Sequence, residues 1–287
     1  METPAALPIE PAASVLLVRD GAEGPEVFMV QRHSRSSVLG GAWVFPGGKV
    51  DAGDGLAGAA AQADALHRQL GEPDLAPDAA LALCMAALRE AFEECGVLFA
   101  EGADAAAAAQ AARLCGEGLL FGEALARLGL APHVGALQPW SRWITPERSV
   151  SFQGRRFDTR FFLAALPAGQ TAVHDDHEAV ASAWLTPREA LRRYWDGEMA
   201  LAPPQIMSLA HIGHLRDVAA LMAGARARPP YCVRPHVFEL DGGMRAMAYP
   251  GDPAHPERER AMPGPLRLKV AGPGRFEPFE GFDAFWI

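Results

Sequence analysis

The sequence predicts an α/β fold in which helices cover a mixed β-sheet, and three observations support this prediction. Segments rich in β-branched and aromatic residues recur along the chain, for example at 13–20, 26–33 and 156–165. Alanine- and leucine-rich segments of helical length lie between them. Hydrophobic residues make up 49% of the 287 residues and charged residues 21%, which is ordinary for a globular protein. Strands and helices in such a mixture indicate a layered domain with a buried sheet.

The first strands are predicted from turn residues. Residues 13–20 and 26–33 should pair as a hairpin, because residues 21–25 contain the glycine and proline that turns require. A third short strand is expected at 43–45, where the chain runs into Pro-Gly-Gly at 46–48. Glycines at such a turn let the backbone approach another group closely.

The first helices follow this turn. An alanine-rich helix is expected at 56–70, and a second helix should begin after Asp78, a good N-cap residue, and run to Cys95. Gly96 supplies its stop. Residues 103–130 are read as two further helices that are broken near 116–118.

In the second half of the chain the sequence predicts three strands, then two helices, and then several short strands. Strands are expected at 136–144, 156–165 and 179–185, one helix should open at Thr186, and another should run from Pro203 towards residue 221. After residue 225 proline and glycine become frequent and only short strands are predicted, at 237–240, 244–248 and 266–270. We therefore expect one main domain with a helical insertion and a β-rich C-terminal extension, with bounds of 10–225 for the domain, about 55–80 for the insertion and 226–287 for the extension.

Composition excludes several classes of partner. The net charge is −9 and no run of lysine or arginine occurs, so the chain is not expected to bind nucleic acid. No apolar run approaches the ~20 residues that a membrane-spanning helix needs. The first residues lack the features of a signal peptide, and the four cysteines show no CxxC spacing. We expect a cytoplasmic protein with free thiols.

The sequence REAFEECGV, residues 89–97, carries the strongest chemical signal. On a helix, Glu90, Glu93 and Glu94 lie opposite an apolar stripe and are spaced so that like charges repel each other. Three carboxylates at this spacing are unfavourable unless a cation lies among them, and their oxygen atoms suit Mg²⁺ or Mn²⁺. A solvated acidic face is the alternative interpretation of this helix taken alone.

Together with the earlier glycine turn, this helix resembles the Nudix box. Gly48 is followed by five residues and then Asp54, and residues 89–97 reproduce the second half of the box. Two features depart from the family pattern. Asp54 stands where the family has glutamate, and 34 residues, 55–88, separate the halves instead of seven. The resemblance implies a Nudix α/β/α sandwich.

The long insertion is similar to one branch of that family, the coenzyme A diphosphatase-like proteins. The similarity extends to the segments WSRWITP, RRFDTRFF and APP at 140–146, 155–162 and 202–204. It implies metal-dependent hydrolysis of a diphosphate linkage, in coenzyme A or acyl-coenzyme A, to 3′,5′-ADP and (acyl-)4′-phosphopantetheine. Two alternatives stay open: a Nudix diphosphatase for NADH, nucleotide sugars or dinucleoside polyphosphates, and a Nudix-fold binding protein without catalysis. The intact set of glutamates argues against the second.

The resemblance also implies roles for individual residues. Glu90, Glu93 and Glu94, with the Gly47 carbonyl, would hold the Mg²⁺ or Mn²⁺ ions. Catalysis would involve Glu90, Glu94 and Glu178, with the general base either Glu94 or Glu178. As structural support, Arg89 would pair with Asp54.

Other conspicuous residues have weaker signals. Arg32 and Arg160 lie on or beside predicted strands near the site and are the candidates for substrate phosphates. His174 and His177 are interpreted as part of a polar loop, because Mg²⁺ prefers oxygen ligands. Trp140 and Trp143 could stack on an adenine, although aromatic residues on strands are more often core.

The partner expected is a small nucleotide. A homodimer is also expected, with its contact formed either by the inserted residues 55–88 or by the extension after residue 225.

Overall fold

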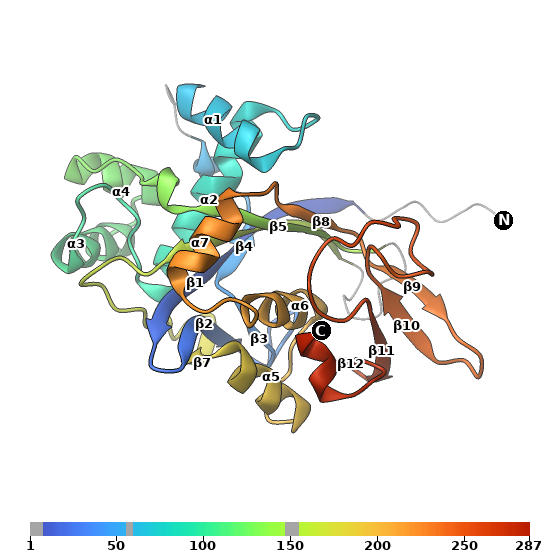
Figure 1. The fold of residues 1–287 in the computed structure, drawn as a ribbon. Coiled ribbons are helices and arrows are strands. Elements are labelled where there is room, and N and C mark those ends of the chain that lie inside the picture. The colour runs from blue at the N-terminus through green and yellow to red at the C-terminus, as the bar shows by residue number, and fades with distance from the viewer. Residues whose placement is uncertain (1–7, 56–59, 147–154) are drawn as a thin grey trace.

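The computed structural model describes residues 8–55, 60–146 and 155–287, and within them it forms a sheet between two helical layers (Figure 1). The main sheet has eight strands in the order β3-β2-β1-β6-β5-β8, with β4 paired to β1 and β7 paired to β2. Both parallel and antiparallel pairs occur, so the predicted mixed sheet is confirmed. The strands are β1 (Ile9–Gly21), β2 (Gly24–Arg32), β3 (Trp43–Val44), β4 (Gly47–Lys49), β5 (Gln138–Ile144), β6 (Arg156–Ala165), β7 (Ala179–Leu185) and β8 (Tyr231–Val233).

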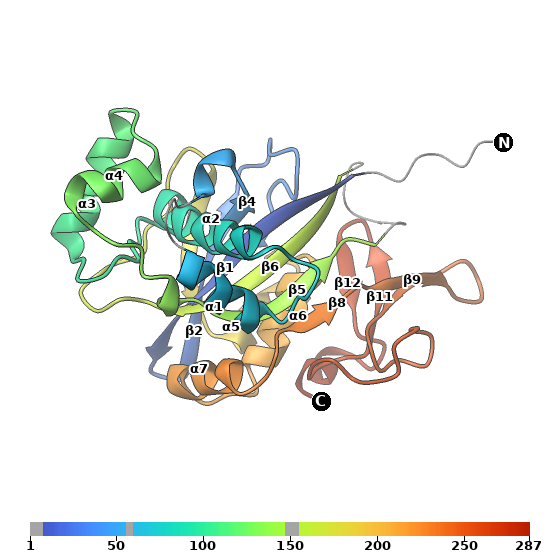
Figure 2. The ribbon, with the colours of Figure 1, turned by 90° about the horizontal axis from the view of Figure 1, so that it is seen from above.

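Two groups of helices cover the two faces of this sheet (Figures 1 and 2). On one face lie α1 (Ala60–Leu70) and α2 (Pro77–Cys95), with α3 (Ala105–Gly116) and α4 (Phe121–Leu128) beyond the end of α2. On the other face lie α5 (Pro187–Trp195), α6 (Pro203–Ile212) and α7 (Val218–Arg226). This three-layer arrangement is the predicted α/β/α sandwich.

The central strand β1 shows why the sequence folds in this way. It runs parallel to β6 over ten paired positions, from Ile9 opposite Arg156 to Val18 opposite Ala165. Val15 and Leu17 pack into the core beneath α2, whereas Leu16 and Val18 pack into the core beneath α5 and α6. An apolar run without alternation is expected for a strand that is covered on both faces. The sheet therefore divides the interior into two cores.

The structure corrects three local predictions. Helix α2 begins at Pro77 with Ala76 as N-cap, so Asp78 lies inside the first turn instead of capping it. The helix expected from Pro203 to about 221 is two helices, because Asp217 caps a new one through the Ala220 N–H. Gly47 and Gly48, expected in a sharp turn, are instead the first two residues of the short strand β4 and pair with β1. The predicted first residues of α1, 56–59, lie outside the described part.

The C-terminal extension forms a second, four-stranded antiparallel sheet in the order β12-β11-β10-β9. Its strands are β9 (His236–Glu239), β10 (Arg245–Ala248), β11 (Arg267–Gly272) and β12 (Arg275–Glu277). The preceding strand β8 instead joins the main sheet, parallel to β5. The Tyr194 hydroxyl of α5 donates to the Phe276 carbonyl at 2.8 Å, which ties the extension to the domain. No helix in the described part of the chain combines the length and apolarity that a bilayer crossing requires.

Candidate active site

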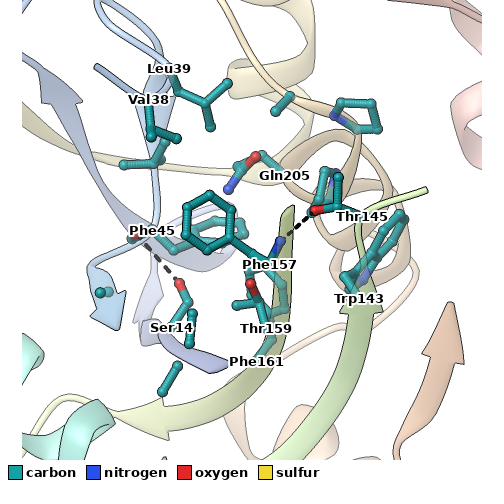
Figure 3. A pocket seen from close by; sticks show the side chains of 18 of the residues that line it. Ser14, Val38, Leu39, Phe45, Trp143, Thr145, Phe157, Thr159, Phe161 and Gln205 are labelled. Atoms are coloured by element: carbon teal, nitrogen blue, oxygen red, sulfur yellow. Dashed lines mark hydrogen bonds between the residues drawn. The ribbon is translucent and has the colours of Figure 1, made fainter. Parts of the chain in front are cut away.

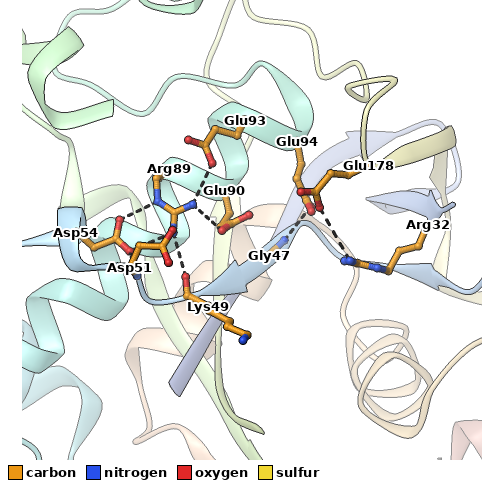
Figure 4. Close-up of polar contacts among 10 residues, drawn as sticks. All are labelled: Arg32, Gly47, Lys49, Asp51, Asp54, Arg89, Glu90, Glu93, Glu94 and Glu178. Atoms are coloured by element: carbon orange, nitrogen blue, oxygen red, sulfur yellow. Dashed lines mark hydrogen bonds and ion pairs between the residues drawn. The ribbon is translucent and has the colours of Figure 1, made fainter. Parts of the chain in front are cut away.

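The two halves of the interrupted box meet at Arg89 (Figure 4). Its Nε donates to Asp54 Oδ1 at 2.8 Å, and its Nη2 donates to Asp54 Oδ2 at 3.1 Å and to the Lys49 carbonyl at 3.0 Å. Asp54 lies in a 3₁₀ turn, Ala52–Asp54, and only 3% of it is exposed. The side chain of Asp54, although shorter than that of glutamate, therefore reaches Arg89. It joins α2 to the glycine loop, the segment 46–54 that contains Gly47 and Gly48.

Arg89 also organises the acidic face of α2. Its Nη1 donates to Glu90 Oε1 at 2.7 Å and to Glu93 Oε2 at 2.9 Å. Glu93 is consequently turned towards Arg89, and 46% of its side chain is exposed. Burial lowers the pKa of Arg89, but the hydrogen bonds and charges of Asp54 and Glu90 outweigh burial and raise the pKa above its usual value, so this guanidinium stays charged.

Glu94 lies deeper, against the glycine loop. It is 6% exposed, and its Oε2 accepts a hydrogen bond from the Gly47 N–H at 2.9 Å. A Cβ on Gly47 would lie 2.5 Å from the Ala13 carbonyl oxygen, and a Cβ on Gly48 would overlap the Glu90 carboxylate. Gly47 is therefore required by its close packing against the backbone of β1, whereas a side chain on Gly48 would displace the Glu90 carboxylate. The role of the Gly47 carbonyl as a metal ligand stays a prediction.

Burial and neighbouring negative charges raise the pKa values of Glu90 and Glu94. The pKa of Glu94 is raised to about 8, chiefly by burial and also by the neighbouring carboxylates of Glu90 and Glu178, whereas the Gly47 N–H and Arg32 lower it. The pKa of Glu90 is raised to about 7, chiefly by burial, against the lowering effect of Arg89 and with smaller contributions from Glu93 and Glu178. A cation bound among these carboxylates would stabilise their ionised form.

Glu178 comes from a different part of the chain and faces the same place. It precedes β7, and its backbone carbonyl accepts a hydrogen bond from His33 at 3.1 Å. Its side chain is 64% exposed and lies 3.9 Å from Arg32 Nη2 (Figure 4). The Arg32 Nε is buried and has no hydrogen-bond partner among the described residues. Arg32 thus has one long ion pair and unused capacity to donate.

The residues present suit a divalent cation chemically. Glu90, Glu94 and Glu178 offer only oxygen donors, which Mg²⁺ and Mn²⁺ prefer. Within residues 8–55, 60–146 and 155–287, no three acidic, histidine or cysteine side chains already converge as a ready-made metal site. Arg89 holds Glu90 and Glu93 instead. The raised pKa values of Glu90 and Glu94 are the feature of this structure that fits a cation.

A cavity of about 370 Å³ opens beside these carboxylates. Arg32, Gly47, Gly48, Glu90 and Glu178 line it on the side of the box. The rest of its wall is mainly apolar (Figure 3) and includes residues from β5, β6, α6 and the C-terminal extension, among them Phe45, Trp143, Phe157, Phe161, Pro203, Gln205 and Met247. A volume of this size lies in the range of ligand pockets, roughly 300–1,000 Å³.

Arg160 is not brought to this cavity. On β6 the side chains of Phe157, Thr159 and Phe161 line the cavity, so Arg160 points to the opposite face of the sheet. There its Nη2 lies 2.5 Å from Glu72 and its Nη1 lies 2.9 Å from Asp158. Arg160 thus forms a largely buried ion pair with Glu72, which joins the insertion to the sheet.

The other conspicuous residues divide in a similar way. Trp140 is core and stacks on His211 at 4.4 Å between ring centroids, whereas Trp143 lines the cavity. His174 contacts Ser182 at 2.8 Å and takes no part in the carboxylate group. Sequence reasoning did not single out Gln205 or Met247. Neither belongs to a local pattern, because residues more than 150 positions after the glycine loop reach the cavity only through folding.

Comparisons with known proteins agree with this geometry. Residues 58–212 match the family described as the NUDT19 Nudix domain, and residues 8–62 match the NUDIX domain. The chain is similar to acyl-coenzyme A diphosphatase NUDT19 of Gallus gallus (33% identity, 70% of this chain and 67% of that protein) and of Homo sapiens (30%, 71% and 65%). It thus spans about two thirds of their length.

A solved structure is similar as well. The crystal structure of a Nudix hydrolase from Alicyclobacillus acidocaldarius has a TM-score of 0.59 and 27% identity, and the match covers 79% of this chain and 99% of that one. The fold, the rejoined box and the family matches lead to one conclusion: the chain belongs to the Nudix hydrolase family, in the group described by the NUDT19 Nudix domain.

Proposed function

We propose that this protein is a divalent-metal-dependent diphosphatase that cleaves coenzyme A or acyl-coenzyme A into 3′,5′-ADP and (acyl-)4′-phosphopantetheine. The observation that carries the proposal is the pair of buried Glu94 and half-buried Glu90, both with raised pKa values, beside a ligand-sized cavity. The relatives named acyl-coenzyme A diphosphatase support the choice of substrate.

Glu90, Glu94 and, at the outer edge, Glu93 would hold Mg²⁺ or Mn²⁺. The ion would neutralise the diphosphate and so favour attack by water at phosphorus. Gly47 fixes Glu94 by its N–H, and Arg89 fixes Glu90, so the chain sets the positions of both inner ligands before substrate arrives.

Arg32 would bind a phosphate oxygen. Its guanidinium lies at the cavity wall and its only ion pair in the described chain is the 3.9 Å contact with Glu178. A phosphate would provide a closer, charge-assisted partner.

Glu178 would accept the proton of the attacking water. Unlike Glu94, which accepts the Gly47 N–H, the Glu178 carboxylate has a large exposed surface and one long contact. A carboxylate with a free lone pair next to the reacting phosphate meets the geometric requirement for a general base.

A substrate panel tests the function. Purified protein with Mg²⁺ or Mn²⁺ is offered coenzyme A, an acyl-coenzyme A, NADH and a nucleotide sugar, and the products are identified by mass. Coenzyme A and its thioester should be cleaved most efficiently. Much faster cleavage of NADH would refute the substrate, and no turnover of any of the four would refute the enzyme.

Three variants test the roles. Glu94→Gln and Glu178→Gln should each lower kcat by about 100-fold or more, as expected for a lost ligand or base. Glu117→Gln is the matched control, because Glu117 directly follows α3 and forms an exposed pair with Arg113. Full activity of both site variants would contradict the assigned roles.

A further inference from the structure

The cavity has a second part whose chemistry differs from that of the carboxylates. Away from Arg32, Glu90 and Glu178, the labelled side chains in Figure 3 are chiefly aromatic and aliphatic. The charged lining residues Lys49 and Arg155 both pair with Glu10. This part of the cavity therefore offers little to a second phosphate and suits a neutral group with apolar surface.

Gln205 is one of the polar side chains in this mainly apolar wall, beside the hydroxyls of Ser14, Thr145 and Thr159 (Figure 3). Gln205 is 6% exposed, and Figure 3 shows it among the cavity-lining side chains. Its Oε1 is buried and has no hydrogen-bond partner among the described residues. A buried amide oxygen that stays unpaired is costly, so natural proteins rarely keep one without a use.

The backbone fixes this amide in place. Gln205 is the third residue of α6, after Pro203 and Pro204, which have no N–H and preset the helical backbone. On the facing strand β5, Trp143 also lines the cavity, and its Nε1 is a second buried polar atom without a partner in the described chain. The wall thus carries an unpaired amide oxygen and an unpaired indole donor within mainly apolar surroundings.

We infer that this part of the cavity binds the pantetheine arm of the substrate, and that Gln205 hydrogen-bonds an amide of that arm. The inference rests on the proposed function and names the residue that would distinguish coenzyme A from other nucleoside diphosphates. A pantetheine arm is uncharged, mostly aliphatic and contains two amides, which matches a mainly apolar wall with an unpaired amide oxygen. Adenine fits less well, because several ring nitrogens and an amino group would need partners there.

The C-terminal extension completes this subsite. Met247 of β10 and Pro235 line the same cavity as Gln205. A methionine side chain is unbranched and adapts to ligands of different shape. The extension therefore closes the apolar wall where the arm and an attached acyl group would lie.

Measuring the affinity of each product tests the contacts of each half of the substrate separately. Affinities of 4′-phosphopantetheine and of 3′,5′-ADP are measured by titration calorimetry, with Mg²⁺ present, for the wild type and for Gln205→Leu. The variant should bind 4′-phosphopantetheine about 10-fold more weakly, the effect of one lost hydrogen bond. Its affinity for 3′,5′-ADP should stay within about twofold.

Gln138→Leu is the matched control. Gln138 is also buried, but it donates to the Gly135 carbonyl at 3.1 Å and does not line this cavity. It should leave both affinities unchanged. Gln205→Asn keeps the amide but withdraws it by one methylene group, so we expect a smaller loss, which also serves if Gln205→Leu fails to fold.

Each other outcome has a definite meaning. Unchanged affinity of Gln205→Leu for 4′-phosphopantetheine, or no binding of it by the wild type, would overturn the inference. An equal loss for 3′,5′-ADP would show that Gln205 contacts the nucleotide instead, and would overturn it as well. Failure of the wild type to cleave coenzyme A, with Gln205-dependent binding of 4′-phosphopantetheine intact, would refute the proposed function and leave this subsite standing.

Discussion

Arg89 donates two hydrogen bonds to Asp54, from Nε to Oδ1 at 2.8 Å and from Nη2 to Oδ2 at 3.1 Å, although 34 residues separate them in the sequence. Asp54→Ala would leave the largely buried guanidinium without this partner. We expect a loss of unfolding free energy of about 3 kcal/mol, measured by denaturant titration. Activity should fall as well, because Arg89 also holds Glu90.

Asp51→Ala is the control for that variant. The Asp51 side chain is 71% exposed and its carboxylate lies 3.7 Å from Arg89, so its removal should change stability by less than about 1 kcal/mol. If Asp54→Ala were as stable as Asp51→Ala, the Asp54 pair would not be what joins the two halves of the box.

The two loop glycines should respond differently to alanine. A methyl group on Gly48 meets the end of the Glu90 side chain, which can move, whereas one on Gly47 meets the backbone of β1, which cannot. Gly48→Ala should therefore fold and lose activity, since it displaces a metal ligand. Gly47→Ala should lower the melting temperature more. Thermal unfolding and kcat, measured for both variants, test this contrast, and the reverse order would contradict it.

The insertion should be anchored by Glu72. Its carboxylate lies 2.5 Å from Arg160 and 2.8 Å from Arg142, on the face of the sheet away from the cavity. Glu72→Ala leaves two arginines to share Asp158, so we expect about 3 kcal/mol lower stability by denaturant titration, with kcat/KM retained in the folded protein. Exposed Glu117→Ala is the near-neutral control. A lower kcat/KM with unchanged stability would instead support a role of Arg160 in substrate binding.

Metal removal should make stability depend on pH. The folded-state pKa values of Glu90 and Glu94, about 7 and about 8, lie above the usual value of 4.5. The folded state therefore binds these protons more tightly than the unfolded state, and this contribution to stability is lost as pH rises from about 4.5 to about 8. In EDTA, the melting temperature should fall across that range.

Two comparisons isolate the glutamates from other titrating groups. Mg²⁺ favours the ionised carboxylates, so the difference in melting temperature between Mg²⁺ and EDTA should grow from pH 5 to pH 8. Glu94→Gln in EDTA should show a shallower decline than the wild type. A constant Mg²⁺ effect across this range would mean that these carboxylates are not the metal ligands.

Much of the fold followed from local patterns. The bounds expected for β6 and β7, and the Gly96 stop of α2, agree with the structure because apolar runs and a left-handed glycine are local signals. The break between α6 and α7 was missed, because the Asp217 cap competes with an otherwise continuous helical pattern. The assignment of β8 to the main sheet depends on its pairing with β5, about 90 residues earlier, which no local pattern carries.

The amino-acid sequence by itself determined the family, the carboxylates of α2 and the glycines beside them, since their spacing follows from helix and turn geometry. Only the tertiary structure decided that Asp54 reaches Arg89, that Arg160 lies on the far face, and that Gln205 and Met247 line the cavity. Strand alternation turns neighbouring residues to opposite faces, and chain folding brings distant ones together. A local motif can therefore indicate the chemistry of this site, whereas the shape of its substrate pocket depends on the packing of α6 and the extension against the sheet.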